Sequence, residues 1–281
     1  MIDLHTHTTA SDGSYSPTEL VQLAKQSQLE AIAITDHDTV AGLAEAQQAA
    51  RTAQLELVSG VELACESKIG TLHLLGYFID RGNQVLKDLL SQMVASRQQR
   101  NPQIIAKLNE LGFQITMEQV QAQASSPIVS RLHIAMAMVQ NNYVRNLDEA
   151  FGRFLGDDGP AYVKRVEPSP AQAVNIIHTA GGLAVVAHPV HLRAASEQEL
   201  TARLKQLADL GLDGVEVWYP EHSTEMTAQL WRFCRQSGLA AVGGSDFHGA
   251  GKEHIKLGVG RGGMNIPLEI LNSLRRRIDA N

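Results

Sequence analysis

The chain concentrates histidine and aspartate in one short stretch near its start, DLHTHTTASDG, residues 3–13. His5 and His7 are two positions apart, so on an extended strand their side chains leave from the same face, which Asp3 shares. Two neighbouring imidazoles repel each other when both are protonated and gain little when both are neutral. A divalent cation removes that conflict, because imidazole and carboxylate groups are its usual ligands. The stretch therefore indicates a metal site.

Further histidines and carboxylates follow at other places in the chain, in the motifs TDHDT, GVEL, HLLGY, AHP and GSDFH. Taken singly, each has an ordinary explanation, such as a hydrogen-bonded core histidine or an aspartate that caps a helix. Together, six histidines and three carboxylates suit two or three closely spaced divalent ions, and the lack of a cysteine partner argues against a structural zinc site. The nine candidate ligands are His5, His7, Asp12, His37, Glu62, His73, His188, Asp246 and His248.

Short apolar segments alternate with amphipathic patterns along most of the chain. Seven of them predict strands: MIDLH, LEAIAITD, LELVSGVEL, TLHLLGYF, GGLAVVAHP, LDGVEVWY and LAAVGGSD. Capping boxes that begin at Ser16 and Ser169, each followed by proline, predict helix starts, and Gly181 and Gly211 mark helix ends.

Strands joined through helices by short connections predict a parallel sheet, and the length of the chain allows one large α/β barrel or two modest domains. The near-continuous apolar character of the strands fits strands that are covered on both faces. In a parallel barrel the carboxyl ends of the strands converge on one face. That face would collect the nine candidate ligands, except that His73 lies within its segment rather than at its end.

Residues 81–166 interrupt the alternation, because they contain little strand pattern. The segment QVLKDLLSQMVASRQQRNPQIIAKLNELG predicts a long helix that is interrupted or restarts near Asn101 and Pro102. TMEQVQAQA, SRLHIAMAMVQNN and LDEAFGRFLG predict shorter helices. We interpret this region as a helical insertion into a barrel formed by residues 1–80 and 167–281.

Composition narrows the classes of protein. The formal net charge of −6 argues against a broad basic surface for long nucleic acid. No apolar run is long enough to span a membrane, and the N-terminus has no secretory pattern. Two distant cysteines, Cys65 and Cys234, are typical of reduced thiols in a cytoplasmic protein.

The six motifs, in this order and spacing, resemble the polymerase-and-histidinol-phosphatase family, a branch near the amidohydrolases. The resemblance covers the whole chain and implies a distorted (β/α)7 barrel with a helical insertion. It also implies two or three divalent ions, most often manganese, zinc or iron, and we expect Mn²⁺. It assigns the ligand role to the nine residues named above, with Glu62 bridging two ions. Such a centre suits a metal-dependent phosphatase, although amide hydrolysis uses similar machinery.

Substrate contacts are expected from the insertion. Arg131 and His133 open a predicted helix, where backbone N–H groups favour anions, and arginine suits bidentate contact with phosphate. A surface arginine and an ordinary histidine would produce the same pattern. A subgroup of the family looks similar through this segment, which implies that both residues bind a substrate phosphate. Weaker candidates for substrate contact are Lys164, Asp38, His191 and His222, whereas His178 and His254 are expected to be structural or exposed.

That subgroup is similar to 3′,5′-nucleotide bisphosphate phosphatases, which remove the 3′-phosphate and leave a 5′-nucleotide. We therefore expect a small nucleotide as substrate, and neither a membrane nor a protein partner. One alternative is a 5′–3′ exoribonuclease that acts on short 5′-phosphorylated RNA, and another is a histidinol-phosphate phosphatase. A third is a non-catalytic or proofreading module bound to a polymerase.

Overall fold

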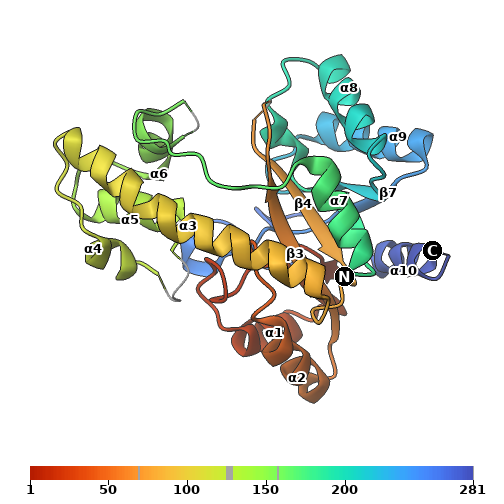
Figure 1. Ribbon diagram of the computed structural model, residues 1–281. Coiled ribbons are helices and arrows are strands. Elements are labelled where there is room, and N and C mark those ends of the chain that lie inside the picture. Colours follow the sequence, from red (N-terminus) through yellow and green to blue (C-terminus); the bar gives the residue numbers. More distant parts are fainter. Residues whose placement is uncertain (69, 125–128, 157, 281) are drawn as a thin grey trace. The chain divides into compact units, whose positions relative to one another are not determined.

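The computed structural model describes residues 1–68, 70–124, 129–156 and 158–280 (Figure 1). The chain divides into two compact units. Met1–Asp88 together with Glu167–Asn281 form the first, which we call the barrel unit, and Leu89–Val166 form the second, which we call the helical unit. No helix among the described residues is both long enough and apolar enough to cross a membrane.

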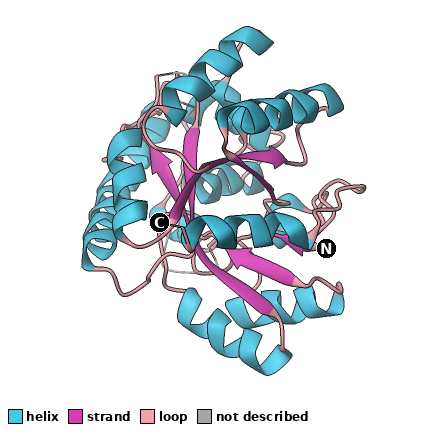
Figure 2. Cartoon of the chain, turned by 90° about the vertical axis from the view of Figure 1, so that its right-hand side faces the viewer, coloured by secondary structure: helices cyan, strands magenta, loops and turns pink. Residues whose placement is uncertain are grey.

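The described part of the barrel unit contains one sheet of seven strands that follow each other in chain order, in a nearly closed barrel (Figure 2). All seven predicted strands are confirmed: β1 Ile2–Asp3, β2 Ala31–Ile34, β3 Glu56–Cys65, β4 Leu72–Tyr77, β5 Leu183–Val186, β6 Gly214–Trp218 and β7 Ala240–Gly243. The two ends of the sheet approach each other beyond β1 and β7. There the Asp246 N–H donates to the His5 carbonyl at 2.8 Å and the His7 N–H donates to the Phe247 carbonyl at 2.9 Å.

The prediction of a wholly parallel sheet is wrong for one strand. β4 is antiparallel to both of its neighbours, β3 and β5, whereas the other neighbouring pairs are parallel. The physical reason is the short connection 66–71, since a parallel crossover needs about a dozen residues or more. The reversal places the amino end of β4 at the edge where its parallel neighbours have their carboxyl ends. His73, at that amino end, therefore lies beside Ala64 near the end of β3.

The helices of the barrel unit are α1 Pro17–Gln26, α2 Leu43–Ala53, α7 Pro170–Thr179, α8 Glu197–Ala208, α9 Thr224–Ser237 and α10 Leu268–Ile278. Two short 3₁₀ turns, η2 Pro189–Leu192 and η3 Gly249–Lys252, follow β5 and β7. Both predicted capping boxes are confirmed at the starts of α1 and α7. Gly181 and Gly211 follow α7 and α8 with positive φ angles, as expected for residues that end helices.

The core of the barrel unit consists of aliphatic side chains from the strands and from α10. Ile2, Leu75, Val185 and Leu271 belong to one buried cluster. Tyr77 is also fully buried there, and its hydroxyl donates to the Leu4 carbonyl at 2.9 Å. The hydrogen bond joins β4 to the end of β1 across the barrel, which stiffens the strands that position the candidate ligands.

The helical unit has its own apolar core. Its elements are α4 Met117–Gln121, α5 Arg131–Gln140, α6 Leu147–Ala150 and the π-helical turn η1 Phe151–Leu155, together with most of α3 Gln84–Glu110. The predicted break near Pro102 is wrong, because α3 is continuous through that residue. Ile104 and Leu108 are buried in the core just beyond it, and the Asn101 side chain donates to the Val129 carbonyl at 2.8 Å. These contacts outweigh the backbone hydrogen bond that a proline cannot donate.

Candidate metal centre

The structure brings all nine candidate ligands together at one end of the barrel. They come from six of the seven strands or from the loops that follow them: β1 (His5, His7, Asp12), β2 (His37), β3 (Glu62), β4 (His73), β5 (His188) and β7 (Asp246, His248). Glu62 lies inside β3, near its carboxyl end. Three overlapping groups of donor atoms lie within 4.8 Å of one another: His7, Asp12, His37, His248; His5, His7, Glu62, Asp246; and His37, Glu62, His73.

Glu62 is at the centre of the cluster and is fully buried. Five imidazole nitrogens lie 2.7–3.2 Å from its two oxygens, those of His5, His7, His37, His73 and His188. A carboxylate offers about four lone-pair sites, so five imidazoles exceed what hydrogen bonding alone can satisfy. The arrangement fits a carboxylate that is shared between cations, each of which is also held by imidazoles.

Asp246 is a second carboxylate that several histidine nitrogens surround. Its Oδ1 lies 3.1 Å from His7 Nε2, 3.4 Å from His248 Nδ1 and 3.6 Å from His5 Nε2. Asp12 extends the group, because its Oδ1 lies 3.4 Å from His248 Nε2. The side chains of Asp246 and Asp12 are at most 9% exposed, so three carboxylates meet in a largely water-free space.

Several buried polar atoms in this cluster have no hydrogen-bond partner among the described residues. They are both ring nitrogens of His7, Oδ1 of Asp12 and Nδ1 of His188. Leaving a polar atom buried without a partner costs about 1–3 kcal/mol, and a folded protein rarely tolerates several at one place. Bound divalent ions would satisfy the His7 and Asp12 atoms, so the donor set fits a metal centre.

The three carboxylates are ionised at neutral pH. Burial alone would raise the pKa of Glu62, but the nearby imidazoles of His37, His5 and His73 lower it well below its ordinary value. The pKa of Asp12 is held low in the same way, against burial, by His37 and His248. Burial would also raise the pKa of Asp246, but the nearby charge of Lys252 contributes most to holding that pKa well below its ordinary value. The centre thus supplies three anionic donors.

The histidines divide into two kinds. Burial lowers the pKa of His37 to about 3, which leaves a neutral imidazole ready to bind a cation. Burial also disfavours protonation of His7, but the nearby Asp246 and Glu62 carboxylates, 3.1 and 3.2 Å from its Nε2, outweigh it and raise its pKa to about 9. The pKa of His5 is raised well above its ordinary value, against burial, chiefly by Glu216. Cations that bind here must therefore displace protons.

Glu216 is a residue of this site that the sequence analysis missed. It is fully buried in β6, its Oε1 lies 2.9 Å from His5 Nδ1, and its Oε2 accepts the His188 N–H at 2.6 Å. A carboxylate that holds one ring nitrogen of a histidine orients the other toward a metal. The signal was present in the sequence, because a glutamate interrupts the apolar strand GVEVW.

Two aspartates position the loops around the cluster. Asp36 accepts hydrogen bonds from the Thr8 N–H, the Thr8 hydroxyl and the Ser11 hydroxyl at 2.6–2.7 Å, which fixes the loop after β1. Asp3 accepts the Ser245 N–H at 2.8 Å and the Ser245 hydroxyl at 2.5 Å, which fixes the loop after β7. Both carboxylates are buried behind the cluster rather than within it.

The weaker candidates in the barrel unit have different surroundings. Asp38 is buried, and its Oδ1 accepts the Ala64 N–H at 3.0 Å, which is a structural contact. His191 lies beside the cluster, with its ring centroid 4.9 Å from that of His188, and burial lowers its pKa to about 3. The Nδ1–H of His222 donates to a backbone carbonyl at 2.9 Å, and its Nε2 has no hydrogen-bond partner among the described residues.

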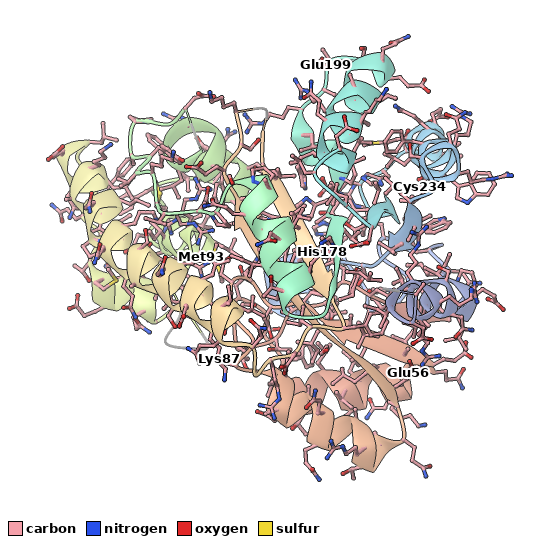
Figure 3. All side chains as sticks on the ribbon, turned by 45° about the vertical axis from the view of Figure 1, so that its right-hand side comes forward. Glu56, Lys87, Met93, His178, Glu199 and Cys234 are labelled. Carbon is pink, nitrogen blue, oxygen red and sulfur yellow. The ribbon has the colours of Figure 1, made fainter. Side chains whose placement is uncertain are left out.

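The remaining histidines of the barrel unit lie apart from the cluster. His178 lies on α7 (Figure 3), and its Nε2 is 2.8 Å from a carboxylate oxygen of Asp213. His254 is exposed just after η3. Neither belongs to a donor group, which agrees with the expectation that both are structural or exposed.

The phosphate-binding candidates belong to the helical unit. Arg131 is the first residue of α5; its guanidinium donates to the Leu155 carbonyl at 3.1 Å and lies 5.5 Å from the centre of the Tyr162 ring. His133 Nδ1 accepts the Ser130 N–H at 3.0 Å, so the ring proton of the neutral imidazole lies on Nε2. Lys164 is exposed in the segment after the π-helical turn.

Comparison with known proteins identifies the family. Residues 3–155, more than half of the chain, match the PHP domain. The chain belongs to the PHP domain family. Members of this family are metal-dependent phosphoesterases, and the cluster of imidazoles and carboxylates at the end of the barrel is able to bind the metals. The protein is accordingly a metal-dependent phosphatase.

Proteins that resemble this chain over most of their length carry different names. A protein named 5′-3′ exoribonuclease from Haemophilus influenzae is 35% identical over 88% of this chain and 89% of its own length. A protein named 3′,5′-nucleoside bisphosphate phosphatase from Chromobacterium violaceum is 33% identical over 89% of this chain and 88% of its own. The two identities are too close to select a substrate.

Solved structures support the same family. A protein from Chromobacterium violaceum described as an amidohydrolase, with bound sulfate and no metal, has a TM-score of 0.86 at 31% identity and covers 99% of this chain and 96% of its own. A protein from Bifidobacterium adolescentis described as a metal-dependent phosphoesterase has a TM-score of 0.84 at 29% identity, with 98% and 96% covered. The distorted barrel with seven strands that the sequence predicted is thereby confirmed.

Proposed function

We propose that this PHP phosphatase removes the 3′-phosphate from nucleoside 3′,5′-bisphosphates and releases 5′-nucleotides. The observation that carries the proposal is the cluster of nine donors around Glu62, in a chain similar to a named bisphosphate phosphatase. Divalent ions held by such a cluster activate water and neutralise the charge of a phosphoryl group. The protein's own contribution is to keep Glu62, Asp12 and Asp246 ionised and to fix the imidazoles through groups such as Glu216.

The donor set supports a centre of two or three ions. Each pair of donor groups has one residue in common, His7, His37 or Glu62, which suits neighbouring ions with common ligands. Imidazoles and carboxylates without a thiolate favour Mn²⁺, Zn²⁺ or Fe²⁺. We propose Mn²⁺ as the working metal, and quantitative metal analysis of the active enzyme tests this choice.

For the second phosphate of the substrate we propose the start of α5 as the binding site. Arg131 there is held by the Leu155 carbonyl and the Tyr162 ring, and the His133 tautomer carries its ring proton on Nε2. Backbone N–H groups at the first turn of a helix add further attraction for an anion. Lys164 is a weaker candidate for the same phosphate, and His191 and His222 for contacts to the leaving group.

The second candidate function is 5′–3′ exoribonuclease activity, which the names of relatives 32–35% identical to this chain favour. Both activities use a terminal phosphate as an anchor and cleave a neighbouring ester. We prefer the small substrate because the net charge of −6 offers no obvious basic track for a long strand. Cys65 and Cys234 are both buried, and two distant cysteines are typical of reduced thiols, so we also propose a cytoplasmic location.

The test is a hydrolysis panel in the presence of Mn²⁺, with adenosine 3′,5′-bisphosphate, a short 5′-phosphorylated RNA and histidinol phosphate as substrates. We expect the highest kcat/KM for the bisphosphate, with adenosine 5′-phosphate and inorganic phosphate as products. Faster stepwise release of mononucleotides from RNA would replace the proposal with the exoribonuclease. Turnover of histidinol phosphate alone would refute both nucleotide activities.

A further inference from the structure

The loop after β7 carries a lysine to which neither the sequence motifs nor the family match assigns a role. Lys252 is the last residue of η3, the turn that directly follows His248. Its Nζ donates to Asp246 Oδ2 at 2.5 Å. One third of the Lys252 side chain is exposed, whereas that of Asp246 is 8% exposed. Lys252 thus contacts the buried cluster through Asp246 while part of its own side chain is exposed.

The two oxygens of Asp246 have separate partners. Oδ1 faces the imidazoles of His7 and His248 at 3.1 and 3.4 Å. Oδ2 accepts the Tyr219 hydroxyl at 3.0 Å and the Lys252 ammonium. Because a cation among the imidazoles would approach Oδ1, the lysine does not compete with it for the same oxygen.

Lys252 has more N–H donors than recorded acceptors. An ammonium group has three N–H bonds, and among the described residues Asp246 is the one acceptor recorded for Lys252. The ammonium sits beside a centre with three ionised carboxylates, on a side chain that is one third exposed. A fixed ammonium at that point attracts the phosphoryl oxygens, which carry the negative charge in the reaction.

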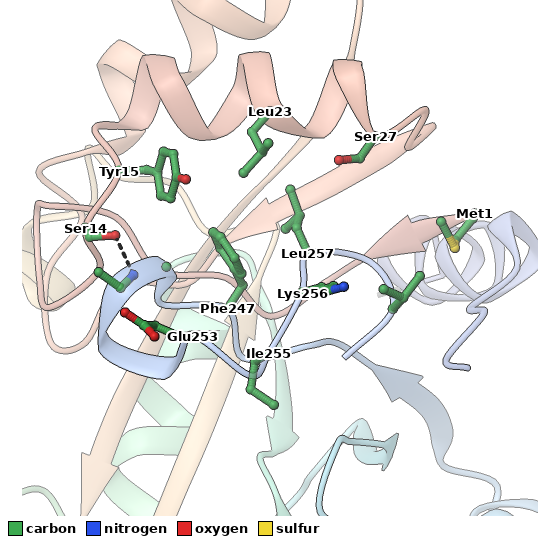
Figure 4. A pocket seen from close by; sticks show the side chains of 13 residues that line it. Met1, Ser14, Tyr15, Leu23, Ser27, Phe247, Glu253, Ile255, Lys256 and Leu257 are labelled. Atoms are coloured by element: carbon green, nitrogen blue, oxygen red, sulfur yellow. Dashed lines mark hydrogen bonds between the residues drawn. The ribbon is translucent and has the colours of Figure 1, made fainter. Parts of the chain in front are cut away.

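The turn that bears Lys252 also has contacts on its other side. Phe247 packs with Tyr15, at 5.7 Å between ring centroids, in a pocket of about 840 Å³, and the Ala250 N–H donates to the Ser14 hydroxyl at 2.9 Å (Figure 4). Gly249 has a φ of +67°, and a Cβ at that position would collide with the Ser14 and Tyr15 side chains. Donors that are preorganised in this way are effective in stabilising developing charge.

We propose that Lys252 binds an oxygen of the phosphoryl group that is being cleaved, while Asp246, which also accepts the Tyr219 hydroxyl, holds its ammonium in place. The inference rests on the proposed phosphoester hydrolysis and adds a residue to it. It differs from the site at the start of α5, which would bind the other phosphate of the substrate. No bond to Lys252 is made or broken, so its contribution is a charged hydrogen bond.

The test compares Lys252→Met with Lys252→Arg and with Lys256→Met, a control at an exposed lysine on the same loop. Metal content, inhibition by inorganic phosphate and kcat/KM for the bisphosphate are measured for each, after thermal unfolding confirms that the variant is folded. We expect Lys252→Met to keep its metal. Its inhibition constant for inorganic phosphate should rise about 10-fold, and its kcat/KM for the bisphosphate should fall about 100-fold. Lys252→Arg should recover part of both losses, and Lys256→Met should behave as the parent.

Two results would overturn the inference. Loss of metal in proportion to loss of activity would reduce Lys252 to a support for Asp246. Unchanged inhibition by phosphate in Lys252→Met would show that the lysine does not contact the anion. Should Lys252→Met fail to fold, Lys252→Gln replaces it, and unchanged inhibition in that variant would show the same. A parent enzyme that hydrolyses no phosphoester at all would refute the proposed function instead, which separates the two failures.

Discussion

Glu216→Gln is the substitution that probes the support of the metal centre most sharply. The glutamate is fully buried and acts as the acceptor for two donors, His5 Nδ1–H and the His188 N–H, at 2.9 and 2.6 Å. Glutamine has the same shape but only one acceptor oxygen. If that oxygen keeps the His188 N–H, the amide N–H₂ faces His5 Nδ1 and favours the tautomer with its proton on Nε2. That proton would point at Glu62 and block the nitrogen that should bind a cation.

The expected magnitude follows from these contacts. Loss of a partner that orients a metal-binding histidine typically costs about 10–100-fold in metal affinity, or about 1.4–2.7 kcal/mol. Proton competition works in the opposite direction, because Glu216 is the main carboxylate that raises the pKa of His5. The variant should therefore show its largest loss of affinity at high pH, where His5 of the parent is already deprotonated. At lower pH the two effects partly cancel.

Isothermal titration of metal-free protein with Mn²⁺, in buffers that differ in ionisation enthalpy, measures both affinity and the number of protons released. We expect Glu216→Gln to bind Mn²⁺ about 10–100-fold more weakly at high pH and to release fewer protons near neutral pH. Glu269→Gln, at an exposed position on α10, serves as the matched control and should match the parent. Parent-like affinity and parent-like proton release in Glu216→Gln would refute the reasoning.

Three further predictions concern the centre and its substrate. His7→Ala and Asp246→Ala should lower the metal content and abolish turnover of any phosphoester, as measured by elemental analysis and a phosphate-release assay; a variant that is depleted of metal but fully active would contradict this. Arg131→Ala should keep the metal yet raise KM for the bisphosphate about 10-fold or more, in line with the loss of a charged hydrogen bond. Arg145→Ala, at an exposed arginine of the same unit, should leave KM unchanged. Equal KM values in the two variants would show that Arg131 does not bind the substrate. Because the pKa of His7 is raised to about 9, Mn²⁺ binding at pH 7.5 should release protons. The number of protons released should fall as the pH approaches 9 and rises above it. No proton release at pH 7.5 would show that the metal-free cluster is not protonated at that pH.

The strands and the nine candidate ligands were predictable because their signals are local. Each motif combines a buried apolar strand with a polar residue at its edge, and a barrel brings such edges together whatever the details of pairing. His73 did not fit this rule, since it lies inside its segment. The antiparallel direction of β4 resolves the exception, because its start is at the same end as the other strand ends.

What could not be predicted depends on contacts between distant parts of the chain. Glu216 is a single acidic residue in an apolar strand, and only the folded barrel shows that it meets His5 and His188. Lys252 and Tyr219 converge on Asp246 from different loops in the same way. The sequence pattern around these residues does not reveal that they contact Asp246. The geometry of the closed barrel supplies that information.

The central claim is that Glu62 is shared between divalent ions that the surrounding imidazoles and carboxylates also hold. Anomalous X-ray diffraction from crystals of the active enzyme grown with Mn²⁺ tests it most directly. We predict two or three manganese peaks among the nine candidate ligands, with Glu62 within coordination distance of two of them. Manganese peaks elsewhere, or a single peak that Glu62 does not contact, would contradict the account.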